Sequence, residues 1–464
     1  MNRSQAPRRI RTVGSVTALV VAATVPLLGA PSAAAGPIEP PPPAPPPSVF
    51  LDTKAIARLD WSVPDRFFAS WDAWRPGSDS YDKDFVAATR GWSLTLNGCA
   101  STSVSKIVGY AYTVKQVGTS RTWQRLSKKC EDTFTGLPAQ GQYTASLTLH
   151  TVGAGPGVSR PTTTTTRIRD YLIVSMGDSL ASGEGVPDRS GRYDSSPKRA
   201  AVWKDRQCHR SAQSGPARAA RHYERNDPKT SVTFLSVACT GAKIQHLYDW
   251  RYNGIGGPKF EDQFEVISAV AGSAGKRPID ALLMSAGVNN LEFASIVERC
   301  ASKVYPPGTP ADRCVVAGGI AKNLKALPAE YDKLARALRT KLPNTRDVFW
   351  NRYPANVFRG GGCNKLGIKW VGIDSDEGKA MHTWGVRLNR TITTAAQKHR
   401  WTLVQDPTES WAKHAYCPRS TSWFRSYEES LRFQGDKLGT AHPNQLGHRN
   451  YAALMQQAIG QSPG

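Results

Sequence analysis

The chain has 464 residues, of which 40% are hydrophobic, and it carries a formal net charge of +23. This length predicts two folded units plus appendages, and the hydrophobic content is too low for a protein with many membrane spans. The basic residues are scattered and no nucleic-acid recognition motif is present. We therefore expect no nucleic-acid partner, and instead an attraction to anionic membranes, cell-wall polymers or an acidic substrate.

The first 35 residues have the pattern of a secretory signal peptide. Arginines precede an apolar stretch at 13–30, and three alanines at 33–35 offer a small-residue cleavage site. Residues 36–48 are rich in proline and predict a stiff, extended linker. We expect a secreted protein whose mature part is free outside the cell.

Residues 49–168 have the short alternating runs of an all-β module. The runs lie at 92–96, 107–117 and 145–149. The turns at Gly136 and Gly141 resemble a turn of bacterial immunoglobulin-like modules, so we predict a small immunoglobulin-like β-sandwich. Residues 50–80 fit it poorly and are expected to pack across both units. A spacer or docking role and polymer binding are both open for this module.

From residue 169 onward the pattern alternates between strands and helices. The predicted strands are 171–176, 232–237, 281–285, 347–350 and 401–404, and the predicted helices are 211–226, 261–273, 321–341 and 377–399. This alternation predicts a parallel sheet with helices on both faces. Residues 299–318 and 408–440 interrupt the rhythm and are expected to form loops at the rim of the site.

All eight cysteines follow the predicted signal peptide, and an even number in an exported protein favours disulfides. They are Cys99, Cys130, Cys208, Cys239, Cys300, Cys314, Cys363 and Cys417. Eight cysteines allow 105 pairings. Our hypothesis is sequential pairing, because each pair then closes a loop within one domain. No CxxC pair or histidine cluster is present, so no metal site is expected.

Residues 171–185, YLIVSMGDSLASGEG, end a buried strand in Gly177, Asp178 and Ser179. A strand that stops there places the Ser179 hydroxyl in the crevice where open α/β sheets bind ligands. The block resembles the nucleophile block of the SGNH (GDSL) hydrolases, a family of esterases and lipases with a flavodoxin-like sheet. The resemblance implies that residues 169–464 are the catalytic domain and Ser179 the nucleophile, with Asp178 organising the turn.

Two further blocks continue this resemblance. Gly241, in SVACTGA, matches the family glycine whose backbone N–H donates to the oxyanion, and Asn289, in GVNNL, matches the asparagine whose side-chain amide does so. Asn290 stands where the family has aspartate. The resemblance implies an oxyanion hole formed by Ser179, Gly241 and Asn289.

The last block, AHPNQLGH, contains His442, which matches the family's catalytic general base. The aspartate expected three residues earlier is Gly439 in this chain. A backbone carbonyl of Gly439 or Thr440 is therefore expected to orient the ring, with Asp436 as a less favoured acceptor. We expect a working Ser-His dyad, and Gly439→Asp to be neutral or better.

Together the four blocks imply a secreted serine esterase or lipase, acting as a monomer on an ester or lipid substrate without cofactor or metal. A polysaccharide acetylesterase, a phospholipase, and a non-catalytic cell-wall-binding protein remain alternatives. Because His442 must be neutral to accept a proton, activity is expected to rise through about pH 6.5.

Overall fold

The computed structural model describes residues 49–78, 80–87, 90–301, 313–316, 319–358, 373–416 and 419–461. Val49–Gly464 form one compact unit. The expected signal peptide, the proline-rich linker, Cys363 and Cys417 lie outside the described residues.

The central sheet of the second part of the chain is parallel, as predicted. Its strands are β11 (Thr162–Gly177), β12 (Thr230–Ser236), β13 (Ile279–Ser285), β14 (Thr345–Trp350) and β15 (Thr402–Leu403). Their spatial order is β12-β11-β13-β14-β15. Counted along the chain this is the order 2-1-3-4-5, the flavodoxin-like arrangement, which binds ligands at the carboxyl ends of its strands.

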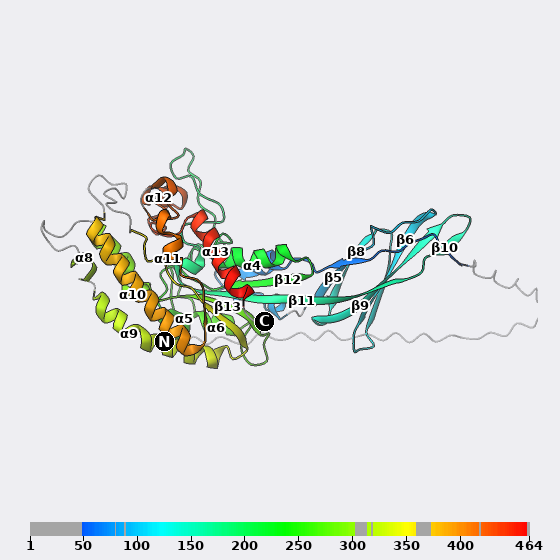
Figure 1. Ribbon diagram of the computed structural model, residues 1–464, viewed down its shortest axis with the longest axis horizontal. Helices are drawn as coiled ribbons and strands as arrows, with labels where there is room; N and C mark the ends of the chain where they lie inside the picture. Colours follow the sequence, from blue (N-terminus) through cyan, green and yellow to red (C-terminus); the bar gives the residue numbers. More distant parts are fainter. Residues whose placement is uncertain are drawn as a thin grey trace, which may run out of the picture. The chain divides into compact units, whose positions relative to one another are not determined.

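Helices cover both faces of this sheet (Figure 1). On one face α4 (Gly215–Asn226) packs beside α13 (Gln445–Gly460), and on the other α9 (Ile320–Lys341) packs beside α10 (Ser375–His399). The shorter helices of this part are α3 (Ser179–Ser182), α5 (Gln245–Tyr248), α6 (Gln263–Ser268), α7 (Phe293–Ala301), α8 (Arg313–Val316), α11 (Pro407–Ser410) and α12 (Tyr427–Phe433). Within the described ranges, no helix has the length and hydropathy needed to cross a bilayer.

Short helices also occur where loops were expected. Helix α8 lies within 299–318, α11 begins at Pro407 and extends into 408–440, and α12 lies within 408–440. The expectation of irregular loops in these two stretches was therefore wrong for α8, α11 and α12. These helices are too short for their periodicity to stand out in the sequence.

The first part of the chain forms small sheets that are mostly antiparallel. One sheet consists of β2 (Asp60–Ser62), β5 (Trp92–Asn97) and β8 (Glu131–Leu137). Another contains β1 (Phe50–Leu51), β6 (Lys106–Gln116), β7 (Thr122–Ser127), β9 (Gly141–Val152) and β10 (Pro156–Val158). In β5 and β9, buried residues alternate with more exposed ones, which explains the alternating sequence. A separate apolar core includes Leu94, Tyr112 and Leu147. The immunoglobulin-like identity of this part stays a prediction.

Strand β11 runs through the predicted boundary between residues 168 and 169. Its first half pairs with β9 in antiparallel fashion, and its second half pairs with β12 and β13 in parallel. The segment expected to pack across both units does reach the central sheet. Helix α1 (Phe67–Asp72) stacks Phe67 on Phe234 of β12 with ring centroids 5.2 Å apart, while Ile56 pairs with Thr102 in the first part.

Candidate active site

Ser179 lies at the carboxyl end of the central strand β11, where the sequence predicted it. The preceding Gly177 has φ +126°, and a Cβ at this position would lie 1.9 Å from the carbonyl oxygen of Ser285. Only glycine can therefore make this turn without displacing β13. The turn makes Ser179 the first residue of α3, and the residue is 6% exposed.

Asp178 holds this turn in place. Its Oδ1 accepts hydrogen bonds from Ser285 Oγ at 2.8 Å and from the Leu180 N–H at 3.1 Å, and the Tyr353 hydroxyl donates to Oδ2. Burial, offset in part by these hydrogen bonds, raises the pKa of Asp178 to about 6. The carboxyl group is fully occupied by structural contacts, which fits the expected organising role.

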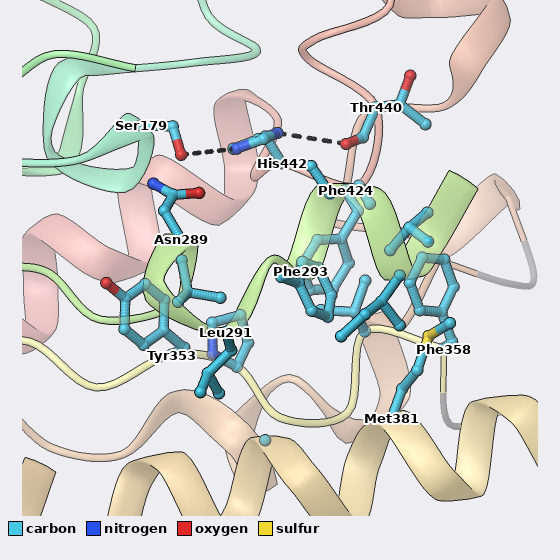
Figure 2. A pocket seen from close by; sticks show the side chains of 18 of the residues that line it. Ser179, Asn289, Leu291, Phe293, Tyr353, Phe358, Met381, Phe424, Thr440 and His442 are labelled. Carbon is cyan, nitrogen blue, oxygen red and sulfur yellow. Dashed lines mark hydrogen bonds between the residues drawn. The ribbon is translucent and has the colours of Figure 1, made fainter. Parts of the chain in front are cut away.

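The imidazole of His442 lies between Ser179 and a main-chain carbonyl (Figure 2). Its Nε2 is 2.8 Å from Ser179 Oγ, and its Nδ1 is 3.2 Å from the Thr440 oxygen. Of the two carbonyls considered from sequence, Thr440 is the one that meets the ring, because the Gly439 oxygen accepts the His442 main-chain N–H at 3.1 Å. Burial lowers the pKa of His442, although the charge of Glu184 and the bond to Thr440 oppose this.

The three expected oxyanion donors meet at the same edge of the sheet. Ser179, Gly241, Asn289 and His442 line one cavity. Asn289 Nδ2 donates one hydrogen bond to the Ala242 oxygen at 3.0 Å, which leaves its second amide hydrogen for a ligand. Among the described residues, no hydrogen bond uses the N–H of Ser179 or Gly241 as donor.

Asn290 links the loop after β13 to the segment that follows Gly241 in the loop after β12. Gly241 has φ +77°, and a Cβ there would lie 2.3 Å from the Tyr252 hydroxyl, so this position also requires glycine. The side chain of Asn290 accepts from the Ile244 N–H at 3.0 Å and donates to Gln245 Oε1 at 2.9 Å. An amide can do both, whereas the aspartate of the family pattern could only accept.

A large apolar cavity opens beside Ser179. Its volume is about 520 Å³, within the range of about 300–1,000 Å³ typical of small-molecule sites. Figure 2 shows Phe293, Phe358, Met381 and Phe424 around it, on the side away from the Ser179 hydroxyl. Side chains from α7, α10 and the segment after β14 contribute to this wall.

Sequence reasoning missed a buried polar cluster behind His442. It consists of Glu184, His209, Thr240 and Gln434. The available signal was Glu184 itself, the one acid among the small residues that follow Ser179 in the nucleophile block. Its partners come from distant segments and carry no local pattern.

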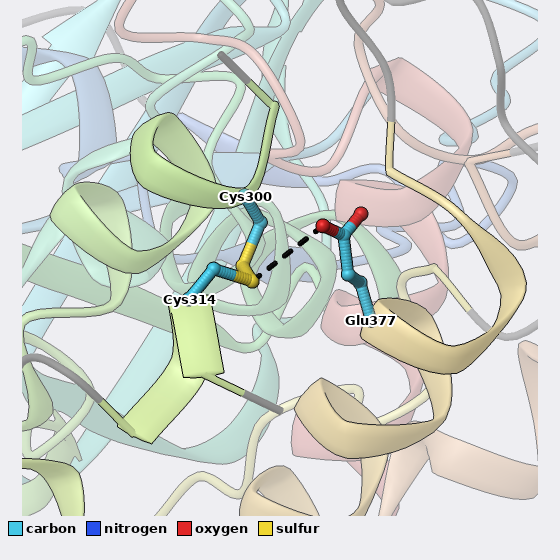
Figure 3. A group of neighbouring side chains, drawn as sticks. All are labelled: Cys300, Cys314 and Glu377. Carbon is cyan, nitrogen blue, oxygen red and sulfur yellow. Dashed lines mark hydrogen bonds between the residues drawn. A yellow bond between two sulfur atoms is a disulfide. The ribbon is translucent and has the colours of Figure 1, made fainter. Parts of the chain in front are cut away.

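Three of the four hypothesised disulfides are present: Cys99–Cys130, Cys208–Cys239 and Cys300–Cys314. The fourth pair, Cys363 with Cys417, lies outside the described residues. Figure 3 shows Glu377 beside the third disulfide, with Oε1 3.6 Å from Cys314 Sγ. These three residues are close enough to share a metal, but disulfide sulfurs are not the thiolates that bind zinc.

Several solved structures resemble the chain. An extracellular lipase from Streptomyces rimosus is 21% identical, with 62% of this chain and 99% of that chain covered and a TM-score of 0.44. Phospholipase A1 from Streptomyces albidoflavus NA297 is 20% identical, with 62% and 99% covered and a TM-score of 0.44. An acetyl xylan esterase is 14% identical, with 62% and 100% covered and a TM-score of 0.30.

No curated protein matches the chain at a significant level. The model of the GDSL-like lipase/acylhydrolase family matches residues 175–449. That match covers more than half of the chain and contains Ser179, Gly241, Asn289 and His442. With the parallel sheet in the order 2-1-3-4-5, this match shows that the chain belongs to the GDSL-like lipase/acylhydrolase family.

Proposed function

We propose that the protein is a secreted serine esterase or lipase that hydrolyses carboxylic esters with a Ser179-His442 dyad. The observation that carries the proposal is the 2.8 Å distance between Ser179 Oγ and His442 Nε2 beside an apolar cavity. The disulfides and the signal-peptide pattern support secretion.

In the first half of the reaction, Ser179 Oγ attacks the ester carbonyl carbon while His442 Nε2 takes the hydroxyl proton. The N–H groups of Ser179 and Gly241 and the Asn289 amide stabilise the oxyanion, and loss of one such donor typically costs about 10²–10³ in rate. The bond to the alcohol oxygen then breaks, and that oxygen takes the proton from His442. In the second half, His442 deprotonates a water, which attacks the acyl carbon and releases the acid and Ser179.

The cavity favours a long acyl chain over an acetyl group. Each CH₂ group buried in an apolar site contributes about 0.8 kcal/mol, or about fourfold in affinity. An acetyl group would leave most of the 520 Å³ empty, so the cavity supports a lipase more than a polysaccharide acetylesterase. A phospholipid is the second candidate substrate, because the net charge of +23 favours anionic surfaces.

The test is hydrolysis of p-nitrophenyl esters from acetate to palmitate. Wild type is expected to prefer chains of about eight carbons or more, and Ser179→Ala to lose about 10⁴-fold or more in kcat. Ser182→Ala is the matched control, since Ser182 is another buried serine of α3 whose hydroxyl donates to the Ser179 carbonyl oxygen and not to His442. Full activity of Ser179→Ala would refute the proposal. A preference for acetate would favour the acetylesterase, and a rate raised by anionic vesicles at low salt would favour a phospholipase.

A further inference from the structure

The loop after α3 contains one acid, Glu184, whose side chain has no exposure to solvent. Its N–H donates to the Ser179 carbonyl oxygen at 3.1 Å, so it belongs to the same turn as the proposed nucleophile. A buried carboxylate is costly unless hydrogen bonds and opposite charge compensate it. The contacts of this carboxylate therefore indicate what it does.

Three donors from three separate segments surround the Glu184 carboxylate. Thr240 Oγ1 donates to Oε2 at 2.7 Å, His209 Nδ1 lies 2.8 Å from the same oxygen, and Gln434 Nε2 donates to Oε1. Thr240 belongs to the loop proposed to hold the oxyanion, and Gln434 to the segment that leads to the proposed base. One side chain thus connects the nucleophile turn, the oxyanion loop and the histidine loop.

Glu184 and His209 form a buried ion pair. Burial alone would raise the pKa of Glu184, but the charge and hydrogen bond of His209, together with His442 and Thr240, lower it to about 2. Burial alone would lower the pKa of His209, but the charge and hydrogen bond of Glu184, together with the charge of Asp436, outweigh burial and the pKa rises. The other side of the His209 ring faces Asp436, with 3.7 Å between Nε2 and Oδ2.

The main chain that carries Glu184 lies directly against His442. A Cβ placed on Gly185 would be 3.5 Å from His442 Cβ. The Arg425 guanidinium donates to the Gly185 oxygen at 2.9 and 3.0 Å, and the Arg425 N–H donates to the His442 oxygen at 2.8 Å. Among the influences that oppose the lowered pKa of His442, the negative charge of Glu184 is the largest.

We propose that Glu184 is a positioning residue that holds the three loops in register and favours the imidazolium form of His442 as Ser179 attacks. This inference rests on the proposed Ser-His chemistry. A carboxylate in contact with the imidazole usually has this role, but position 439 is glycine in this chain. Glu184 supplies the negative charge without touching the ring. The charged or titratable groups around His442 are Glu184, His209, Asp436, Lys437, His448 and Arg425.

Two substitutions test the role of charge with little change of shape. Glu184→Gln removes the negative charge, and His209→Asn removes the positive one while keeping an N–H donor near the position of Nδ1. Asparagine also tolerates the left-handed backbone of His209, whose φ is +49°. The pKa of His442 is read in the full-length protein by NMR of labelled histidine, assigned with His442→Gln, and kcat is measured over the same pH range.

Glu184→Gln is expected to lower the pKa of His442 and to lower kcat by about 10–100-fold. His209→Asn is expected to raise the pKa of His442. A purely structural role would reduce kcat in both variants without these opposite displacements, and that result would overturn the inference. If Glu184→Gln does not fold, the pKa of His442 measured in His209→Asn still tests the inference. If the wild type is inactive but the two variants change the pKa of His442 as expected, the Ser-His chemistry is refuted and the effect of Glu184 on His442 is not.

Discussion

The carbonyl oxygen of Thr440 lies 3.2 Å from Nδ1 of His442, at the place where the family pattern provides an aspartate. A carbonyl can fix the orientation of the ring, but it carries no charge to stabilise imidazolium. Asp436 does not compensate by contact, because its Oδ1 accepts from Gln434 Nε2 at 2.7 Å and from the Leu438 N–H at 2.8 Å. Beyond its main-chain hydrogen bonds, the proton affinity of His442 therefore depends on burial and on charges that do not contact the ring.

The first prediction is that activity persists below the pH expected from sequence. His442 must be neutral to accept the Ser179 proton, and burial lowers its pKa below the ordinary value of 6.5. As the pH falls, the neutral fraction is lost only around this lowered pKa, so the acid limb of kcat/KM should lie below pH 6.5. A profile from pH 4 to 8 on a non-titrating ester measures it, with circular dichroism at each pH as the folding control. A midpoint above 6.5 would contradict the prediction.

The second prediction concerns Gly439→Asp, which from sequence alone was expected to be neutral or better. The space around Gly439 argues against this, because a Cβ there would lie 2.7 Å from Gln434 Oε1 and 2.9 Å from Ser430 Oγ. Both side chains are buried and hydrogen-bonded, so neither can move freely. We expect reduced kcat for Gly439→Asp and equally for Gly439→Ala, which adds the Cβ without charge. Clearly higher activity of the aspartate variant would show that the carboxylate reaches His442.

The sheet was predictable because β11, β12 and β13 contain short apolar runs that are buried on both faces, as in parallel sheets. Ser179, Gly241 and Asn289 each follow one of these runs, so the topology brings them to one edge. We placed a domain boundary at residue 168 and so did not predict that β11 is one continuous strand. Its polar first half, which contains Thr162–Thr166, and its buried second half have different patterns.

The buried cluster around Glu184 could not be predicted, since its contacts join residues up to 250 positions apart. The choice between the Gly439 and Thr440 carbonyls was also beyond sequence reasoning. It depends on the turn at Ala441, whose φ of +61° is unusual for alanine and directs the Gly439 oxygen to the main chain. Neither feature has a local signature in residue type.

The third prediction is that Gly177→Ala destabilises the folded protein far more than the positive φ of this position alone implies. The new Cβ would meet the Ser285 oxygen at 1.9 Å, and that oxygen belongs to the neighbouring strand. We expect a loss of more than about 4 kcal/mol in the free energy of unfolding. Gly275→Ala is the matched control, because Gly275 has φ +72° and open space around it, and it should cost only about 1–2 kcal/mol. Chemical denaturation measures both, and similar losses would disprove the steric argument.

The fourth prediction compares two disulfides with the same sequence separation of 31 residues. Removing either by paired Cys→Ala substitution should cost about 3–4 kcal/mol on the chain-entropy model. Only the Cys208–Cys239 variant should also lose activity below its unfolding temperature, because the Cys208 oxygen accepts the Thr240 N–H at 3.1 Å, next to the proposed oxyanion donor Gly241. The Cys99–Cys130 variant serves as the control for general destabilisation. Equal losses of activity in the two variants would contradict a local role of the Cys208–Cys239 disulfide.

The fifth prediction is that the wall of the cavity on the side away from Ser179 determines which acyl chain lengths are preferred. Met381 of α10 lines it on the side away from Ser179 (Figure 2) and is 5% exposed. Met381→Trp should fill this space and reduce kcat/KM for palmitate while leaving butyrate nearly unchanged, with about fourfold lost for each CH₂ displaced. Val386→Trp is the matched control, because Val386 lies on the same helix and is 38% exposed. The measurement is kcat/KM across the ester series. If Met381→Trp lowered the rate for all chain lengths equally, the acyl chain would have to bind elsewhere, and the cavity would lose its role in selecting the substrate.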